Sequence, residues 1–178
     1  MHYAKDLVEP NTREISAISP GVLGTTGIET SEIITSIVEN IKPDALIVID
    51  SLASKSIERI SSTIQISDTG IVPGAGVGNT RKELSKNTLG VPVIAIGVPM
   101  VVDLATITND CLDIFIENLQ SQAKSNDYLN NLKNQDNYEE IKTALNPRDY
   151  NMIVTPKEID KLIENMSKII SKAINMAM

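Results

Sequence analysis

Residues Lys42–Ser56 read KPDALIVIDSLASKS, and residues Gly90–Ile107 read GVPVIAIGVPMVVDLATI. Each segment contains an unbroken apolar run, Ala45–Ile49 in the first and Pro92–Ile96 in the second. Such runs are typical of interior parallel strands whose two faces are both covered. The two segments therefore predict an α/β protein in which Asp50 directly follows a strand, at the carboxyl edge of the sheet.

Helical spacing of apolar residues predicts helices on either side of these strands. One helix is capped by Thr30 or Ser31 and ends at Lys42, and another runs from about Val101 to Ala123. The clearest is a C-terminal amphipathic helix at about 156–176, which begins at a capping box with proline in the first helical position. Its apolar stripe suits core packing or a subunit contact. Shorter elements are predicted as a strand over Thr63–Ser67 and a helix over Leu52–Ile60.

Length and composition are those of a soluble globular protein. The 178 residues, 42% apolar and 22% charged, are enough for a single domain spanning 1–178, with a polar excursion at about 124–148. No apolar run approaches the ~20 residues of a membrane span, and the start has no signal-peptide core, which predicts a cytoplasmic location. The formal net charge of −7 argues against a nucleic-acid surface.

Cysteine and histidine are too scarce for several kinds of catalytic or metal site. The one cysteine, Cys111, excludes an internal disulfide, and its apolar helical surroundings predict a buried, inert thiol. The one histidine, His2, lies at the terminus, which argues against a Ser-His or Cys-His pair and against a zinc peptidase site. Carboxylates remain as the chemistry for hydrolysis.

Asp50 is the first candidate for such chemistry. A carboxylate at the end of a buried strand is held rigidly and is partly desolvated, which suits acid–base work. The alternative is that Asp50 caps a following helix. Asp68, in Ser-Asp-Thr-Gly, is predicted to be a turn residue, and Asp103 an N-terminal helix charge.

A glycine loop, PGAGVGNT at Pro73–Thr80, invites a phosphate-binding interpretation. Its glycines fall as GxGxG rather than GxGxxG, and no Gly-Lys-Ser/Thr follows, so the signal is weak. A loop that passes close to other backbone, or to an extended substrate, needs glycine equally. Both interpretations stay open on the residues alone.

Several long strings resemble the germination protease family of endospore-forming bacteria, endopeptidases that degrade small acid-soluble spore proteins. They are PGVLGTTGIETSEII (Pro20–Ile34), TIQISDTGIVPGAGVGNTRKELS (Thr63–Ser85), the two strand segments quoted first, and VTPKEID (Val154–Asp160) with the helix after it. The resemblance runs from about Ile15 to the end and is weakest across Lys124–Arg148.

The resemblance implies a three-layer α/β/α sandwich related to the hydrogenase-maturation peptidases. It also implies a homotetramer, synthesis as a zymogen, and an atypical aspartic mechanism that uses two aspartates and no cofactor. The second aspartate matches Asp50 in IVIDSLA, whereas the first would fall before Met1. The chain is accordingly expected to be the C-terminal portion of the enzyme, a partial domain that lacks its first strand and has little activity alone.

The missing strand leaves a sheet edge at which chains can pair, so self-association is expected. The expected partners are small acid-soluble spore proteins as substrate and further copies of the chain, with no metal, membrane or nucleic acid, in the cytoplasm of the spore core. A competing hypothesis is a non-catalytic peptide-binding remnant, and another is a phosphate- or nucleotide-binding module using Gly74–Gly78. With Asp50, the predicted substrate groove is lined by Thr25, Thr26, Gly74, Gly76, Gly78 and Asn79.

Overall fold

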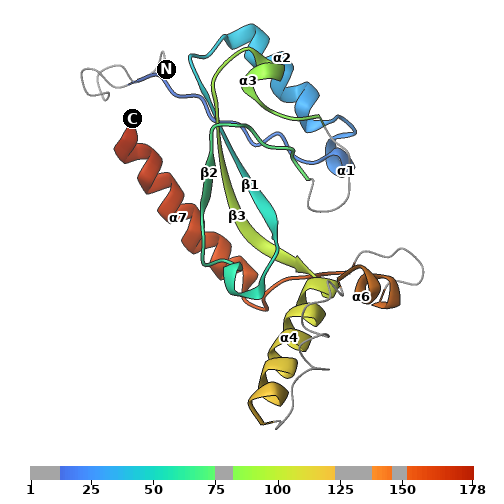
Figure 1. Cartoon of the computed structure of the whole chain (residues 1–178). Coiled ribbons are helices and arrows are strands. Elements are labelled where there is room, and N and C mark those ends of the chain that lie inside the picture. Colours follow the sequence, from blue (N-terminus) through green and yellow to red (C-terminus); the bar gives the residue numbers. More distant parts are fainter. Residues whose placement is uncertain (1–12, 75–81, 123–137, 146–151) are drawn as a thin grey trace. The chain divides into compact units, whose positions relative to one another are not determined.

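The computed structural model describes residues 13–74, 82–122, 138–145 and 152–178. The chain divides into two compact units, one formed by Met1–Lys42 with Asp160–Met178 and the other by Pro43–Ile159. Each unit is described by itself below, with the labels of Figure 1. The single domain over 1–178 stays a prediction.

The second unit is built on a mixed sheet. Its strands are β1 (Leu46–Ser54), β2 (Gln65–Ser67), β3 (Val93–Asp103) and β4 (Ile153–Val154). The order is β1-β3-β2, with β1 parallel to β3 and β2 antiparallel to it, while β4 pairs with the end of β3. Figure 1 shows β3 between β1 and β2. The predicted α/β class is confirmed; the three-layer sandwich, the relation to hydrogenase-maturation peptidases and the missing strand stay predictions.

Strand β1 continues well past the residue at which the sequence predicts its end. Asp50 pairs with Gly97, and the ladder runs on until Ser54 pairs with Val102. The helix predicted over Leu52–Ile60 is therefore wrong, and only a short 3₁₀ turn, η2 (Ile57–Arg59), forms there. The reason is the length of β3, which offers backbone partners to the second half of β1. The register shifts after Leu52, where β3 carries one extra residue in a β-bulge.

The core of the second unit lies along β3. Its fully buried side chains include Val93 and Val102, with 2% and 1% of their surface exposed, and Ala95, Val98 and Met100 are buried between them. This burial explains why the apolar run continues as strand beyond the predicted Ile96. The short helix α3 (Lys86–Leu89) precedes β3.

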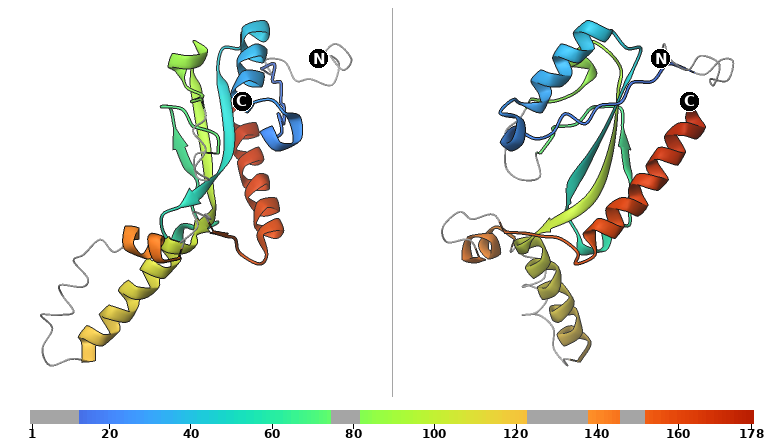
Figure 2. Two further views of the ribbon diagram at one scale, coloured as in Figure 1. Left: turned by 90° about the vertical axis from the view of Figure 1, so that its right-hand side faces the viewer. Right: turned by 180° about the vertical axis from the view of Figure 1, so that it is seen from behind.

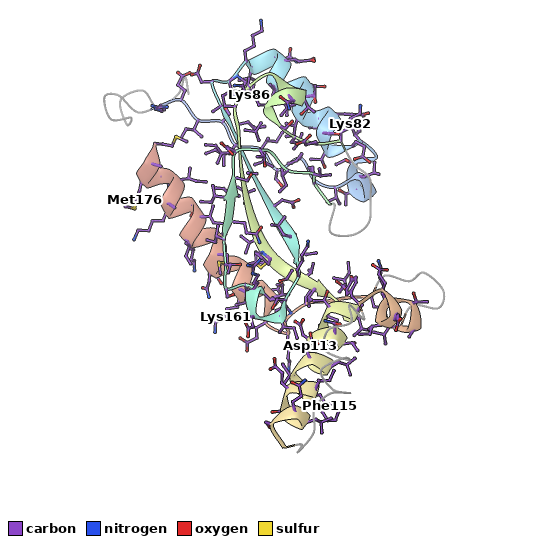
Figure 3. The ribbon with its side chains drawn as sticks, in the orientation of Figure 1. Lys82, Lys86, Asp113, Phe115, Lys161 and Met176 are labelled. Carbon is purple, nitrogen blue, oxygen red and sulfur yellow. The ribbon has the colours of Figure 1, made fainter. Side chains whose placement is uncertain are left out.

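Helix α4 (Leu104–Gln122) follows β3 and contacts α6 (Tyr138–Leu145), which lies beside its first turns in both views of Figure 2. One face of α4 carries the apolar residues Leu112, Phe115, Ile116 and Leu119. Only Ile116 of these is buried, and Phe115 projects outward from the helix (Figure 3). Cys111 is exposed, so the prediction of a buried thiol is wrong. The physical reason is that the described elements in contact with α4 leave this face open. Most of the polar excursion predicted at 124–148 lies outside the described residues.

The first unit contains α1 (Leu23–Thr26), α2 (Thr30–Ile41) and α7 (Ile159–Ala177), although the first residue of α7 is grouped with the second unit. Glu29, not Thr30 or Ser31, is the N-cap of α2. Helix α7 begins three residues later than the capping box predicts, because Pro156–Ile159 first forms a turn closed by a hydrogen bond from the Ile159 N–H to the Pro156 carbonyl. None of the helices in the described part of the chain is long and apolar enough to span a bilayer.

Candidate active site

Asp50 lies in the middle of β1, not at its end. Four residues of the strand precede it and four follow it (46–49 and 51–54). Its side chain is half-buried, and its Oδ1 accepts a hydrogen bond of 2.8 Å from the backbone N–H of Ser51. The carboxylate is thus held on a rigid strand, as predicted, but at a different position along it. The alternative, in which it caps a following helix, is wrong because no helix starts there.

The Ser51 amide points to the edge of β1 that faces away from β3. The Leu46 N–H donates to the Pro92 carbonyl on the β3 side, at 2.9 Å. Because amide directions alternate along a strand, the amides of Val48 and Asp50 also face β3, and that of Ser51 faces the opposite edge. No strand of the described part of the chain pairs with that edge. The Asp50 carboxylate therefore accepts a hydrogen bond from the amide of the next residue, Ser51, an amide that no strand of the described residues pairs with.

One row of the sheet contains Asp50, Gly97 and Gln65, because both outer residues pair with Gly97. A Cβ on Gly97 would lie 2.3 Å from Cδ1 of Leu52, so the Leu52 side chain lies directly over this glycine. Leu52 is on the same face as Asp50, two residues along the strand. Sequence reasoning missed all three neighbours. The available signal was the glycine inside the apolar run VIAIGVPMV, which indicates a close approach.

Asp103 has the structural role that the sequence predicts. Its carboxylate accepts hydrogen bonds from the Thr106 N–H at 2.8 Å and from the Thr106 hydroxyl at 2.7 Å, which caps α4. Asp68 is exposed in the turn after β2, where the Ser67 and Thr69 hydroxyls lie 2.6 Å apart. Neither aspartate shares a row of the sheet with Asp50.

Tyr138, the first residue of α6, is hydrogen-bonded to the Asp103 cap. Burial raises the pKa of the Tyr138 phenol above its ordinary value of 10.0, and the Asp103 charge raises it further. The Lys142 ammonium, 5.8 Å from the ring centroid, opposes the rise. This cluster joins the start of α4 to α6. Sequence reasoning missed it because Tyr138 and Asp103 are far apart in the chain.

The predicted groove residues fall in different parts of the structure. Thr25 and Thr26 belong to the first unit, and their hydroxyls both donate to the Val22 carbonyl, at 2.9 and 3.1 Å. Gly74 belongs to the second unit and has a left-handed backbone, with φ of 71°. The remaining predicted residues lie outside the described part of the chain: Gly76, Gly78 and Asn79.

The two ends of the glycine segment are tied together in the second unit. Ile71 and Leu84 exchange two backbone hydrogen bonds, of 3.0 and 2.8 Å. Gly70 precedes this pair with φ of 101°, and a Cβ there would lie 2.5 Å from the Leu84 carbonyl oxygen. Only glycine fits this position. The fold thus brings the start and the end of the segment 72–83 together.

Metal-ligating side chains do not gather anywhere in residues 13–74, 82–122, 138–145 and 152–178. No group of three or more His, Cys, Asp or Glu side chains with the geometry of a metal site occurs there. The chemistry available at Asp50 within the described residues is that of a carboxylate and backbone amides.

These features define an α/β protein whose candidate reactive group is an aspartate on β1, in the parallel strand pair of the sheet. The chain belongs to the germination protease family, whose model matches residues 1–134 and 117–178. It is 52% identical over 177 residues to the germination protease of Clostridium perfringens (strain SM101), covering 97% of this chain and 54% of that protein.

Two further germination proteases also match nearly the whole of this chain. The germination protease of Clostridium acetobutylicum is 50% identical over 180 residues, with 99% of this chain and 55% of the relative covered. That of a Geobacillus species is 44% identical over 212 aligned positions, with 99% of this chain and 57% of the relative covered. The chain therefore spans about half the length of the curated relatives that it matches.

Proposed function

We propose that this chain supplies one carboxylate, Asp50, to an endopeptidase of the germination protease type. Family membership supports the reaction class, and the half-buried position of Asp50 in the middle of β1 supports its role. The observation that carries the assignment to this residue is its hydrogen bond to the Ser51 amide. This bond holds one oxygen of the carboxylate against the backbone of the strand.

Peptide hydrolysis by carboxylates needs two of them. One activates a water molecule while the other supplies or holds a proton. Asp50 can do one of these tasks, and neither Asp68 nor Asp103 lies in its row of the sheet. The second carboxylate therefore comes from the part of the protease length that this chain does not cover, and the chain alone is inactive.

The substrates of the complete enzyme are small acid-soluble spore proteins, cut during germination in the cytoplasm of the spore core. Flexible substrates suit the site, because an extended peptide can lie along a sheet edge and form backbone hydrogen bonds with it. Synthesis as a zymogen, assembly as a homotetramer, and a groove that includes Thr25, Thr26 and the 74–79 segment belong to the same proposal.

The test is cleavage of a purified small acid-soluble spore protein. The chain alone should leave it intact. Addition of the part of the C. perfringens germination protease that does not align with this chain should produce cleavage. Asp50→Asn should then lower the rate by at least about 100-fold, which is the smaller end of the contribution of a general acid or base.

Asp44→Asn is the matched control, because it makes the same change at an exposed aspartate just before β1. It should leave the rate unchanged. Cleavage by the chain alone that is lost in Asp68→Asn would contradict the proposal. Binding of the spore protein without cleavage, even after the addition, would favour the peptide-binding remnant, and thermal stabilisation by nucleotides would favour the phosphate-binding module.

A further inference from the structure

We infer that Gln65, on β2, is a further catalytic residue of the peptidase. Its side-chain amide donates a hydrogen bond to the carbonyl oxygen of the peptide group that is cut, opposite Asp50. The inference rests on the proposed function and deepens it, because it assigns the carbonyl oxygen to Gln65 and the attacking water molecule to Asp50.

The first observation is that Asp50 and Gln65 share one face of the sheet, on either side of β3 (Figure 1). Both residues pair with Gly97, and residues that pair across strands direct their side chains to the same face. The Leu52 side chain lies over Gly97, because a Cβ there would lie 2.3 Å from the Leu52 Cδ1. An apolar group therefore separates the carboxylate of Asp50 from the carboxamide of Gln65.

The second observation is that the strand positions around this row are apolar. Those that share its face on β1 and β3 are Val48, Leu52, Ala95 and Pro99. Ser67 shares the face on β2, but its hydroxyl lies 2.6 Å from the Thr69 hydroxyl and accepts a hydrogen bond of 3.1 Å from the Thr69 N–H. An apolar surface with a few placed polar groups is typical of a ligand site.

The third observation is that the Gln65 carboxamide is available. Gln65 is exposed, and its side chain makes no hydrogen bond within the described residues. A carboxamide has two N–H donors and can bind a peptide carbonyl oxygen, whereas an ionised carboxylate only accepts hydrogen bonds. Gln65 thus supplies the donor that Asp50 lacks.

The span of the row fits a peptide group and a water molecule. Asp50 and Gln65 are two strand spacings apart, so their Cα atoms are separated by about 10 Å. A carboxylate, the water that it holds, the carbonyl under attack and an amide bound to the carbonyl oxygen also extend over about 10 Å. The two side chains can therefore contact the same peptide group from opposite sides.

The chemical step assigns one task to each group. The water oxygen forms a bond to the carbonyl carbon, the carbonyl π pair moves to the carbonyl oxygen, and the water proton passes to Asp50. Gln65 stabilises the negative charge on that oxygen through its N–H. When the pair returns, the carbon–nitrogen bond breaks, and the leaving nitrogen takes a proton from the carboxylic acid.

Steady-state cleavage of the spore protein tests this role. The chain is combined with the unaligned part of the C. perfringens germination protease. Gln65→Glu keeps the size of the side chain but removes its donors, so kcat should fall by at least about 100-fold while KM changes much less. Gln65→Lys carries a donor and should recover part of the loss. Both should unfold at the wild-type urea midpoint, because Gln65 is exposed.

A titration of the chain alone gives a readout that does not depend on cleavage. The spore protein is added to the isotope-labelled chain, and the side-chain amide signals are followed by NMR. Those of Gln65 should shift, because they gain a carbonyl acceptor. Those of Asn118 should not, since it is an exposed carboxamide on α4, outside the sheet. Asn118→Ala is the matched control for the kinetics and should leave kcat unchanged.

Failure of the two proposals can be told apart. Unchanged kcat in Gln65→Glu, together with loss of cleavage in Asp50→Asn, would overturn the role of Gln65 and keep that of Asp50. Unchanged cleavage in Asp50→Asn would overturn both. Equal losses in Gln65→Glu and Gln65→Lys would show that the donor is not what matters, which also overturns the inference. If the combined parts do not cleave, the titration decides: no shift at Gln65 overturns its role.

Discussion

Gly97 and Leu52 are the residues that lie beside the Asp50 side chain on the sheet. Gly97 lies beside it in the next strand, and Leu52 lies over Gly97 where a larger residue would place its Cβ. The absent side chain is therefore what allows Leu52 to pack flat on the sheet beside the carboxylate. Gly97 therefore contributes to the site by leaving space for the Leu52 side chain.

Gly97→Ala should destabilise the protein by about 1–3 kcal/mol, because the new methyl group overlaps Leu52. Urea unfolding followed by circular dichroism measures the change. Adding Leu52→Ala should recover part of the loss, since the overlap disappears. Gly24→Ala is the control, because a Cβ there meets nothing within 4 Å and should be neutral or slightly stabilising. Full stability of Gly97→Ala would show that Leu52 does not lie over Gly97.

At the scale of elements, the junction of β3 and α4 depends on Asp103. Asp103→Ala should cost about 0.5–2 kcal/mol in unfolding free energy, because the Thr106 amide loses its cap. Asp103→Asn should cost less, since an asparagine oxygen also caps helices. Thermal unfolding of the two variants gives the comparison. Equal losses would show that charge, not the hydrogen bond to the backbone, is the main contribution.

The pH dependence of the α4–α6 contact belongs to Tyr138. Its pKa is raised in the folded protein, so folding favours the protonated phenol. The associated stability is fully present below pH about 10, the pKa in the unfolded chain, and is lost as pH rises through the higher folded pKa. The stability difference between wild type and Tyr138→Phe should therefore shrink in strong alkali.

Difference absorbance of tyrosinate, wild type minus Tyr138→Phe, isolates the titration of this phenol. Asp103→Asn should lower the pKa of Tyr138 toward its ordinary value, because it removes a negative charge and a charged acceptor. Titration of Tyr138 in step with the other tyrosines would contradict the hydrogen-bonded cluster.

At the scale of the whole molecule, the first unit combines both ends of the chain. In α7, Ile170 is buried with 7% exposure, whereas its neighbour Ile169 is 54% exposed. Ile170→Ala should therefore cost about 2–5 kcal/mol, and Ile169→Ala should stay within about 0.5 kcal/mol of wild type. Urea unfolding measures both. Similar losses in the two variants would show that the buried side of α7 is assigned incorrectly.

Local patterns along the chain were enough for the α/β class, for α2 and α7 to within a few residues, and for the place of Asp103 at the N-terminus of a helix. Long strings were enough for the family. They succeed because helix periodicity, capping and apolar runs are properties of neighbouring residues. The same patterns led to Asp50, since it stands at the end of an apolar run.

The tertiary structure alone decided that β1 continues past Asp50, that Cys111 is exposed, and that Gly97, Leu52 and the Ser51 amide surround the candidate carboxylate. The continuation of β1, the exposure of Cys111 and the place of Gly97 depend on residues distant in the sequence, whereas Ser51 and Leu52 are sequence neighbours of Asp50 that the strand conformation places around it. A strand continues where a neighbouring strand supplies hydrogen bonds, and an apolar helix face is buried only where another element covers it. Such partners are chosen by the packing of the whole chain and cannot be read from one segment.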